Sequence, residues 1–365
     1  MANKKHELPV YSIFMHPQDL RELKRDIWCD EPLPAKLKIG KRHYEIDIVY
    51  RGSHIRKWEK KSYDLFFIKP AAFLGGASAC HLNAEYIDRS LIRNKLSMDF
   101  FADLGVLAPR SRHVLVTLNG SFQGVYLQLE SVDEQFLVNR ELPQGPIYYA
   151  VDDDANFSLM SPLDTEIKKE ATAGYERKCG TKADDDDLRD LIYKINTIPK
   201  AEFGKEIQKF VHVDHYLRWL TGIVCTQNFD GFIHNYALYR NSETGLFEMI
   251  PWDFDATWGR DINGREMEPD FIPIQGYNTL TARLLDDAGH RRVYRRLLEK
   301  TLEHEFTVDY FTPKIEHLHN LLRPHVLNDP YIKENINIFD KEPEFIQQFI
   351  IGRNHYLKDH LGDLD

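Results

Sequence analysis

The feature that most constrains this chain is a short predicted hairpin in its second half. Residues 236–240 (Tyr-Ala-Leu-Tyr-Arg) and 246–250 (Leu-Phe-Glu-Met-Ile) are alternating and aromatic-rich, and the run 241–245 (Asn-Ser-Glu-Thr-Gly) is typical of a turn. A hairpin of this length brings its two ends side by side. The residues immediately before and after it are therefore expected to form one site.

Four polar residues flank this hairpin. Asp230 and Asn235 precede it, and Asp253 and Asp255 follow it in the sequence Pro-Trp-Asp-Phe-Asp. The first pair has the D-x-x-x-x-N spacing of the protein-kinase catalytic loop, and Asp-Phe-Asp is similar to the kinase D-F-G element. Phosphoryl transfer needs a carboxylate that orients the attacking hydroxyl and hard oxygen ligands for Mg²⁺. We therefore predict that Asp230 is catalytic and that Asn235 and Asp253 bind metal, with Asp255 either a further ligand or a partner of Arg260.

Each of these residues also has a structural interpretation. Asp230 follows a predicted helix and precedes a glycine, so it could cap the helix end, and Asp253 could be a loop carboxylate paired with Arg260 or Arg265. The D-x-D pattern of Asp253 and Asp255 also occurs in metal-dependent glycosyltransferases. That alternative is disfavoured because no doubly wound nucleotide-sugar domain precedes the motif.

Several short segments occur in order along nearly the full length of the chain. These segments are 50–53 (Tyr-Arg-Gly-Ser), 60–63 (Lys-Lys-Ser-Tyr), 82–86 (Leu-Asn-Ala-Glu-Tyr), 90–95 (Ser-Leu-Ile-Arg-Asn-Lys), 119–120 (Asn-Gly), 124–127 (Gly-Val-Tyr-Leu) with Glu130, and 251–255 (Pro-Trp-Asp-Phe-Asp). Taken in this order, they resemble the CotH kinase family. The resemblance implies an atypical two-lobed protein kinase that uses ATP and a divalent metal, Mg²⁺ or alternatively Mn²⁺, to phosphorylate serine or threonine in other proteins.

The resemblance also implies partners and a location. Members of the family are expected to act on basic, serine-rich spore coat proteins and to support coat assembly, in the mother-cell cytoplasm and the spore coat. A non-enzymatic alternative is a nucleotide-binding scaffold that organises coat layers. The predicted set of Asp230, Asn235 and Asp253 favours the enzyme.

Composition limits the other classes of partner. The formal net charge is −10 and the pI is about 5.9, which argues against nucleic-acid binding and suits basic substrates. The chain has no run of about 18 apolar residues and no apolar segment after its polar first residues, so neither a membrane span nor a signal peptide is expected. The four cysteines are far apart and are expected to be reduced.

The length of 365 residues predicts two lobes in an α+β, kinase-like fold, with a smaller lobe at 1–135 and a larger, mainly helical lobe at 136–365. Strands are expected at 37–52 and 62–68, a helix at 90–104, a hairpin at 113–118 and 124–130 around Asn119-Gly120, irregular sequence from about 150 to 187, and helices at 188–195, 213–226, 286–304, 313–327 and 343–361. Pro313 is expected to begin its helix.

Basic residues before the second of the predicted strands are candidates for binding the nucleotide phosphates. Lys61 is the predicted phosphate-binding lysine, with Arg51 and Arg56 as helpers. The alternative is a solvated basic edge. No G-x-G-x-x-G is present, so side chains would have to hold the phosphates. Glu85 and Asp99 are both candidates for the acid that pairs with Lys61.

Two aromatic residues are candidates for contact with adenine. Trp252 directly precedes Asp253, and Tyr149 follows the predicted inter-lobe hinge at 130–136. Aromatic faces stack on nucleobases and contribute about 1–3 kcal/mol per base. Packing in the hydrophobic core remains the alternative for both residues.

Overall fold

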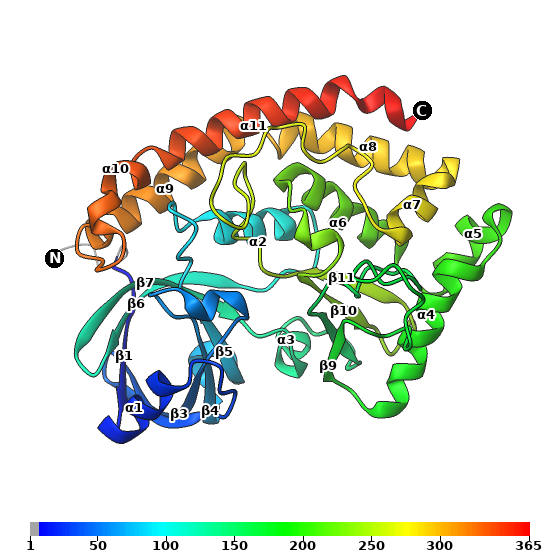
Figure 1. Cartoon of the computed structure of the whole chain (residues 1–365). Helices are drawn as coiled ribbons and strands as arrows, with labels where there is room; N and C mark the ends of the chain where they lie inside the picture. The colour runs from blue at the N-terminus through cyan, green and yellow to red at the C-terminus, as the bar shows by residue number, and fades with distance from the viewer. Residues whose placement is uncertain (1–6) are drawn as a thin grey trace. The chain divides into compact units, whose positions relative to one another are not determined.

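The computed structural model describes residues 7–365, which form two compact units (Figure 1). Unit 1 comprises residues 7–95, Arg110–Ser131 and Pro313–Phe345, and unit 2 comprises Leu96–Pro109, Val132–Thr312 and Ile346–Asp365. Unit 1 is rich in β-sheet and unit 2 is mainly helical, which confirms the predicted α+β class with two lobes. The prediction that no signal peptide begins the chain concerns residues 1–6, which lie outside the described part.

Seven strands of unit 1 form a closed barrel. They are β1 (Val10–Met15), β2 (Leu33–Ile39), β3 (Arg42–Tyr50), β4 (Tyr63–Ala71), β5 (Ala77–Asn83), β6 (Ser111–Leu118) and β7 (Ser121–Glu130), in the order β1-β2-β3-β4-β5-β7-β6. Neighbouring strands pair antiparallel except β1 and β6, whose parallel pairing closes the barrel. Closure leaves no unpaired sheet edge in this unit.

The turn between β6 and β7 shows why the sequence closes the barrel here. Asn119 and Gly120 take φ angles of 48° and 82°, which a two-residue hairpin turn requires and which Asn-Gly adopts readily. The Asn119 side chain also bonds both backbone groups of Met15, at 2.8 Å and 3.0 Å. The same residue therefore makes the hairpin and ties it to the end of β1.

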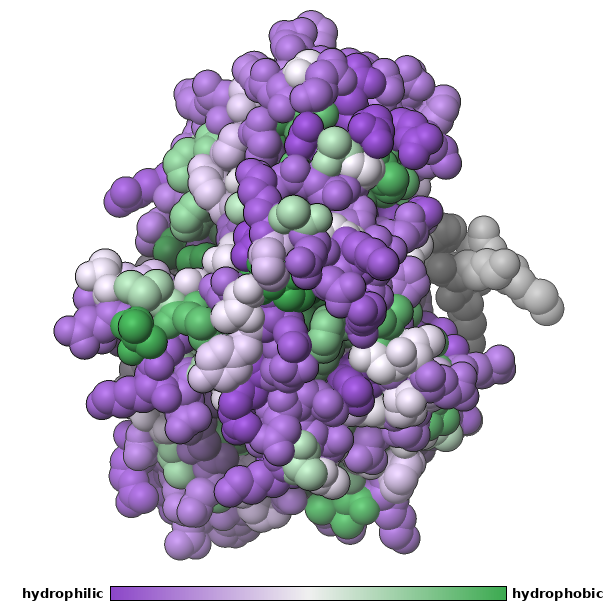
Figure 2. Space-filling view, turned by 90° about the vertical axis from the view of Figure 1, so that its right-hand side faces the viewer, coloured by the Kyte–Doolittle hydropathy of each residue, from purple (hydrophilic) through white to green (hydrophobic). Residues whose placement is uncertain are grey.

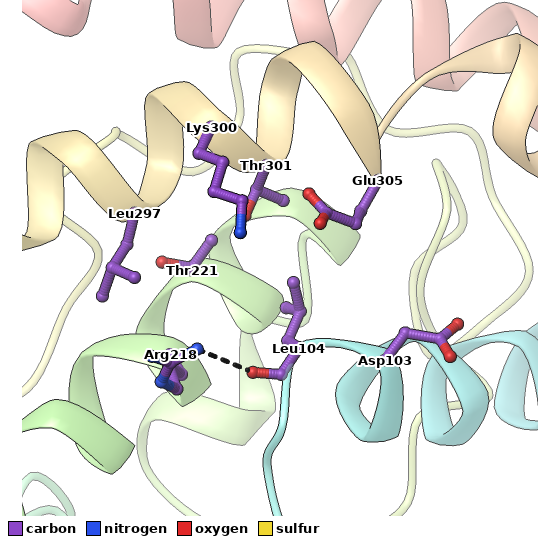
Figure 3. A pocket seen from close by; sticks show the side chains of 8 residues that line it. All are labelled: Asp103, Leu104, Arg218, Thr221, Leu297, Lys300, Thr301 and Glu305. Atoms are coloured by element: carbon purple, nitrogen blue, oxygen red, sulfur yellow. Dashed lines mark hydrogen bonds between the residues drawn. The ribbon is translucent and has the colours of Figure 1, made fainter.

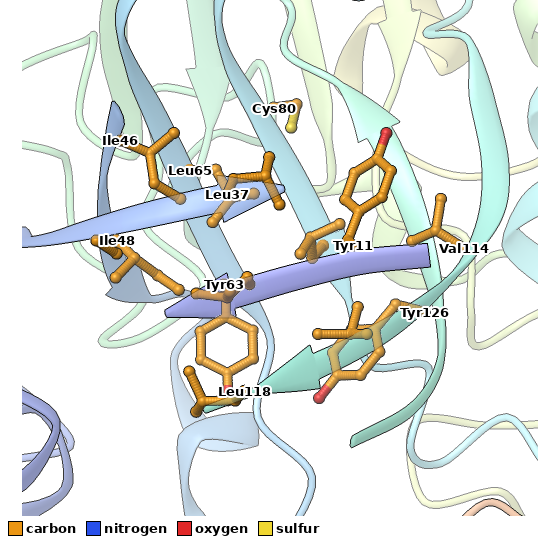
Figure 4. Close-up of a cluster of buried hydrophobic side chains, with 14 of the residues drawn as sticks. Tyr11, Leu37, Ile46, Ile48, Tyr63, Leu65, Cys80, Val114, Leu118 and Tyr126 are labelled. Carbon is orange, nitrogen blue, oxygen red and sulfur yellow. The ribbon is translucent and has the colours of Figure 1, made fainter. Parts of the chain in front are cut away.

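The interior of the barrel is filled by side chains from all of its strands. Figure 4 shows Tyr11, Leu37, Ile48, Leu65, Val114 and their neighbours directed into this core. In β1 and β2, buried residues alternate with more exposed ones, as the two-residue period of a strand requires. Burial of this apolar surface stabilises the barrel.

A segment from the C-terminal part of the chain is anchored in unit 1 by a buried ion pair. The Lys60 ammonium and the Asp329 carboxylate are fully buried and lie 3.5 Å apart. Asp329 also accepts the N–H of Val125 at 2.9 Å, and Lys60 donates to the carbonyl of the same residue at 2.5 Å. A Cβ on Gly124 would lie 2.0 Å from Asp329 Oδ2, so only glycine fits opposite this carboxylate.

A second buried charge cluster anchors the same segment. The Arg93 guanidinium, with no exposed surface, lies 2.5 Å from Asp88 and 2.6 Å from Glu342. Asp88 also accepts the backbone N–H groups of Ser90 and Arg93, at 2.9 Å each. The two carboxylates and these hydrogen bonds offset the free-energy cost of removing the guanidinium from water. A buried guanidinium without such partners would strongly destabilise the fold.

Unit 2 contains a four-stranded antiparallel sheet and most of the helices. The sheet has the order β11-β10-β8-β9, from β8 (Ile147–Ala150), β9 (Tyr175–Cys179), β10 (Tyr236–Arg240) and β11 (Phe247–Pro251). Its helices are α3 (Glu134–Val138), α4 (Asp185–Thr197), α5 (Lys200–Glu206), α6 (Val213–Thr226), α7 (Thr279–Asp286) and α8 (Ala288–His304). Helix α6 packs against both β11 and α8.

The remaining helices lie in unit 1 or contribute residues to both units. Helices α1 (Pro17–Arg25) and α10 (Ile336–Phe339) belong to unit 1, whereas α2 (Arg93–Asp103), α9 (Val308–Val326) and α11 (Glu342–Asp359) have residues in each. Within the described residues, no helix is both long enough and apolar enough to cross a membrane. One face of the molecule is mainly hydrophilic, with small scattered hydrophobic spots (Figure 2).

Most predicted elements are confirmed, and the errors have local causes. The two predicted hairpins and the helix at 213–226 are present. The prediction that Pro313 begins a helix is wrong, because Pro313 lies inside α9 and the side chain of Thr307 accepts the N–H of Tyr310 near the helix start. The region expected to be irregular contains β9.

The predicted division into lobes at residues 1–135 and 136–365 remains a prediction. The structural division falls close to it, between Ser131 and Val132, but each unit is built from three separate stretches of the chain. Unit 1 takes Pro313–Phe345 from the predicted larger lobe, and unit 2 takes Leu96–Pro109 from the predicted smaller one. Composition and local patterns gave no sign of this exchange.

The buried pair in unit 1 predicts strong coupling between Lys60 and Asp329. Asp329→Asn should lower the thermal unfolding midpoint sharply, because removing one partner of a buried ion pair costs about 3–5 kcal/mol. Adding Lys60→Met should recover part of the loss, since neither position of the pair then carries a charge. Calorimetry of the two single variants and the double variant measures the coupling. Losses that simply add would show that the pair is not coupled.

A buried histidine in unit 1 predicts a loss of stability in acid. His113 is 4% exposed, its Nε2 lies 2.7 Å from the carbonyl of Leu91, and burial lowers its pKa to about 4. The unfolded chain, with a histidine pKa of about 6.5, binds this proton at a higher pH than the folded chain does. Stability is therefore complete above pH 6.5 and falls as the pH drops towards 4, by up to about 1.4 kcal/mol per pH unit.

The measurement is the unfolding midpoint at pH 7, 6 and 5. His113→Gln, which can still donate to the Leu91 carbonyl but does not titrate, should lose less stability over this range than the wild type. His43→Gln, a substitution at an exposed position, is the matched control and should follow the wild type. Equal acid sensitivity of His113→Gln and the wild type would contradict the prediction.

Candidate functional site

The β10–β11 hairpin brings two of the predicted metal ligands onto neighbouring strand ends. Tyr236 pairs with Pro251 in the antiparallel register, and beyond this pair the N–H of Trp252 donates to the carbonyl of Asn235 at 3.2 Å. Asn235 therefore lies directly across from the residue that precedes Asp253. The expectation that the hairpin ends meet is confirmed.

Asp230 reaches this region from the end of α6. The helix stops at Thr226 because Gln227 takes a left-handed conformation with φ 58°. Asp230 then opens a single 3₁₀ turn, and its carbonyl accepts the N–H groups of Ile233 at 3.0 Å and His234 at 2.8 Å. The turn carries the chain from Asp230 to Asn235 within unit 2.

A buried amide connects the two predicted catalytic segments. The Oδ1 atom of Asn228 accepts the N–H of Gly231 at 3.0 Å, and its Nδ2 donates to the carbonyl of Asp253 at 3.4 Å. Asn228 is only 2% exposed. No role was predicted for Asn228 from the sequence, although it stands at the start of the segment that contains Asp230. Its position identifies it as a residue that fixes Asp253 relative to the Asp230 turn.

Phe254 anchors the Asp-Phe-Asp element. Its ring is fully buried and meets Phe101 of α2 edge to face, with centroids 4.9 Å apart, while Asp253 and Asp255 on either side are half-buried. Arg260 lies 3.4 Å from Glu266, and Asp253 forms no ion pair with any residue of the described chain. The carboxylate of Asp253 is therefore not occupied by the arginines that the structural interpretation proposed.

The donor set suits a hard divalent cation that binds with few protein ligands. No group of three or more His, Cys, Asp or Glu side chains within residues 7–365 is arranged to hold a metal ion. The predicted ligands are instead one amide, Asn235, and carboxylates from Asp253 and Asp255. Mg²⁺ commonly uses one or two carboxylates together with water and substrate phosphates, so these residues fit such an ion and not a closed structural site.

Both principal ligands have left-handed backbone conformations. Asn235 has φ 58° and Asp253 has φ 57°, and the nearby Trp258 has φ 52°. Asn and Asp tolerate this region better than other residues with a Cβ, whereas a tryptophan there is strained. Such residues persist only where the surrounding contacts hold them, and they are concentrated at functional sites.

In unit 1, the structure separates the two neighbouring lysines of the phosphate prediction. Lys61 donates to the backbone carbonyls of Arg56 and, at 2.6 Å, Trp58. Lys60 is the buried partner of Asp329, and burial lowers its pKa while Asp329 acts in the opposite direction. The assignment of Lys61 to phosphate remains a prediction. In the structure, the Lys61 ammonium holds the loop before β4 through these two hydrogen bonds.

The two predicted helper arginines are held by carboxylates. Arg51 Nε lies 3.1 Å from Asp64 Oδ1, and Arg51 also donates to Asn83. Arg56 lies 2.6 Å from Asp30. Binding of phosphate by either side chain would therefore require it to share or exchange a carboxylate partner.

The two candidate acids for the lysine lie in different units. Glu85 belongs to unit 1, is 4% exposed and accepts the amide of Asn94 at 3.1 Å. Its charge also acts to raise the pKa of Lys60. Asp99 lies in the part of α2 assigned to unit 2. Of the two candidates, Glu85 is thus the one in unit 1, and the lysine that its charge affects is Lys60, whose ion-pair partner is Asp329.

The two aromatic candidates for adenine contact each other. The rings of Tyr149 and Trp252 have centroids 5.1 Å apart and are inclined by 35°, which is a direct aromatic contact. The Tyr149 hydroxyl bonds both backbone groups of Val132 at 3.1 Å. Trp252 is buried at 8% exposure and Tyr149 is half-buried, and the two rings leave no room for a base between them.

Two cavities of unit 2 lie outside the set of predicted residues. A small one of about 60 Å³ is lined by charged side chains that include Arg218, Lys300 and Glu305 (Figure 3). A larger hollow of about 550 Å³ is lined by Ile233 together with Asn156, Ser158, Met160, Ser161, Pro162, Asn278, Thr279, Ala282 and Arg283. Ile233 belongs to the Asp230–Asn235 turn, so the larger hollow adjoins the predicted catalytic residue.

Comparison with known proteins gives relatives over nearly the whole chain. Inner spore coat protein H of Bacillus subtilis strain 168 is 58% identical over 357 residues, which cover 98% of each protein. The inner spore coat protein H-like protein of the same organism is 27% identical over 310 residues, covering 84% of this chain and 87% of that protein. Among solved structures, the proinflammatory kinase CtkA of Helicobacter pylori gives a TM-score of 0.37 at 12% identity, covering 83% of this chain and 94% of CtkA.

A family model described as CotH kinase protein matches residues 48–357. This range includes the hairpin, the Asp230–Asn235 turn and the Asp-Phe-Asp element. Together with the 58% identity over almost the full length, it confirms the resemblance inferred from the sequence motifs. The chain belongs to the CotH kinase protein family.

Proposed function

We propose that this protein is an atypical protein kinase that transfers the γ-phosphate of ATP to serine or threonine of basic, serine-rich spore coat proteins, and so supports coat assembly. The observation that carries the proposal is the β10–β11 junction, where Trp252 donates to Asn235 and so brings Asn235 beside Asp253. The 58% identity with an inner spore coat protein supports the coat assignment. The net charge of −10 supports a basic substrate.

In the proposed reaction, each residue has a defined task. Asp230 accepts a hydrogen bond from the attacking hydroxyl and so directs its oxygen towards the γ-phosphorus. Asn235 and Asp253, with Asp255 as a further candidate, would hold Mg²⁺, which neutralises charge on the phosphates when it is bound. Asn228 keeps these two segments in register through its bonds to Gly231 and Asp253.

The nucleotide is assigned to the residues predicted from the sequence. Lys61, Arg51 and Arg56 of unit 1 bind phosphate oxygens in this proposal. The candidates for contact with adenine remain Trp252 and Tyr149 of unit 2. Lys60 is fully buried and paired with Asp329, so Lys61→Met is the variant expected to weaken ATP binding, as a direct binding measurement would show.

Asp253→Asn is expected to abolish metal-dependent transfer of label from ATP to a basic serine-rich peptide while leaving the unfolding midpoint near that of the wild type. The substitution removes the charge of the metal ligand, and asparagine can adopt the same left-handed backbone conformation as Asp253. Asp190→Asn, the same change at an exposed position of α4, should remain fully active. A variant with wild-type turnover at saturating Mg²⁺ would show that Asp253 is not a ligand.

The same assay distinguishes the other enzyme class. A kinase should gain thermal stability from ATP or ADP with divalent metal, because ligand binding to the folded state raises the midpoint. Stabilisation by UDP- or GDP-sugars in preference to adenine nucleotides would contradict the kinase proposal and favour a glycosyltransferase.

Asp230→Asn is expected to lower peptide phosphorylation by roughly 10²–10⁴-fold, the range typical of a general base. The affinity for ATP should be nearly unchanged, because Asp230 is assigned to the hydroxyl of the protein substrate. Kinetics with the peptide and a separate binding measurement with ATP check both parts. If wild type and variant restore coat assembly equally well in a strain that lacks this protein, the scaffold alternative is correct.

A further inference from the structure

Lys168, a half-buried lysine, organises the loop next to the predicted metal ligand Asn235. The Lys168 ammonium donates to the carbonyl of Asp154, to Oδ1 of Asn156 at 2.8 Å and to the carbonyl of Ser158 at 2.8 Å. Its three donors are therefore all directed at one short stretch of the chain, residues 154–158. The ammonium thus binds several oxygens of one loop and holds the loop together, as a bound metal ion would.

The loop is closed and tightly packed around this ammonium. Asp152 accepts the N–H of Asp154 at 2.9 Å through its side chain and the N–H of Ala155 at 3.0 Å through its carbonyl. A Cβ on Gly174 would lie 2.3 Å from the Ala155 nitrogen, so the neighbouring chain leaves no free space there. Burial lowers the pKa of Lys168 to about 8, and Asp154 and Asp152 act in the opposite direction, as expected for a half-buried ammonium.

This loop contacts the residues on both sides of Asn235. Asp153 Oδ1 lies 2.8 Å from Nδ1 of His234. The carbonyl of Ala155 accepts the hydroxyl of Tyr236, and Phe157 stacks on the same tyrosine ring at 5.5 Å with an interplanar angle of 9°. The N–H of Asn235 itself donates to Ala150, the last residue of β8, at 3.2 Å.

We infer that Lys168 and Asp153 are positioning residues for Asn235: Lys168 fixes the loop 152–158, and this loop holds His234 and Tyr236 so that the amide between them is presented in its left-handed conformation. The inference rests on the proposed function for the role of Asn235 as a metal ligand. Neither residue touches substrate or metal. Both act through the backbone that carries the ligand.

The chemistry of metal sites explains why such support matters. Groups that orient a ligand typically change metal affinity by about 10–100-fold when they are removed. Asn235 is a neutral ligand, so it binds a cation more weakly than a carboxylate does, and its contribution depends on accurate placement.

Three variants test the inference. Lys168→Met removes the ammonium but keeps the length of the side chain, and Asp153→Asn removes only the charge opposite His234, at a position whose side chain is 41% exposed. Lys169→Met is the matched control, because the adjacent lysine is exposed. If Lys168→Met fails to fold, Asp153→Asn still tests the connection between the loop and His234.

The first measurement is amide hydrogen exchange of the metal-free protein. Lys168→Met should increase exchange in residues 150–158 and also in residues 230–236, whereas Asp153→Asn should increase it in residues 230–236 alone. Lys169→Met should match the wild type. Loss of protection confined to 150–158 in Lys168→Met, with 230–236 unchanged, would overturn the inference and make Lys168 a locally structural residue.

The second measurement is Mn²⁺ binding in the presence of ADP, followed by the loss of the free-ion electron paramagnetic resonance signal. Lys168→Met should weaken Mn²⁺ binding by about 10–100-fold, while the KM for a peptide substrate stays unchanged. Mn²⁺ affinity equal to that of the wild type would overturn the inference. If the wild type itself binds no Mn²⁺, the proposed metal site fails, and the exchange of residues 230–236 alone decides whether Lys168 positions this turn.

Discussion

The register of the β10–β11 hairpin determines which residues meet at the candidate site. Because side chains alternate between the two faces of a strand, a shift by one residue would turn every side chain of the hairpin to the opposite face. The pairing of Tyr236 with Pro251 therefore sets the position of both Asn235 and Asp253. Most side chains on both faces of the hairpin are buried, so the hydrophobic packing of unit 2 and its chemistry depend on the same alignment.

Unit 1 depends on a different constraint: a segment distant in the sequence, Pro313–Phe345, must pack into it. Lys60 and Asp329 are 269 residues apart in the sequence, and Arg93 and Glu342 are 249 apart. Buried ion pairs contribute little net stability but are costly when broken. These pairs favour one arrangement of Pro313–Phe345, because burial of Asp329 and Glu342 is tolerated only where each carboxylate meets its cation.

This contrast explains how much of the structure could be predicted from the sequence. The hairpins, α6 and the flanking site residues follow from turn residues and hydrophobic periods that lie within about 30 residues of one another, so local patterns were sufficient. The closure of the barrel by β1 and the pairing of Lys60 with Asp329 depend on contacts between distant residues, which no local pattern records. For the same reason the sequence favoured Lys61, whereas Lys60 is the lysine held in the interior, and it gave no role to Asn228.

The residue types at the site suit both the left-handed backbone conformation and the proposed metal binding. Asn235 and Asp253 both adopt φ near +57°, where Asn and Asp are tolerated and most other side chains are strained. An alanine at either position would add a backbone cost to the loss of the ligand, so its effect on activity would not isolate metal binding. Exchange between Asn and Asp changes the charge alone. The contacts of His234 and Tyr236 with the Lys168 loop then explain how Asn235, placed between them, keeps a conformation that it would not hold in an isolated turn.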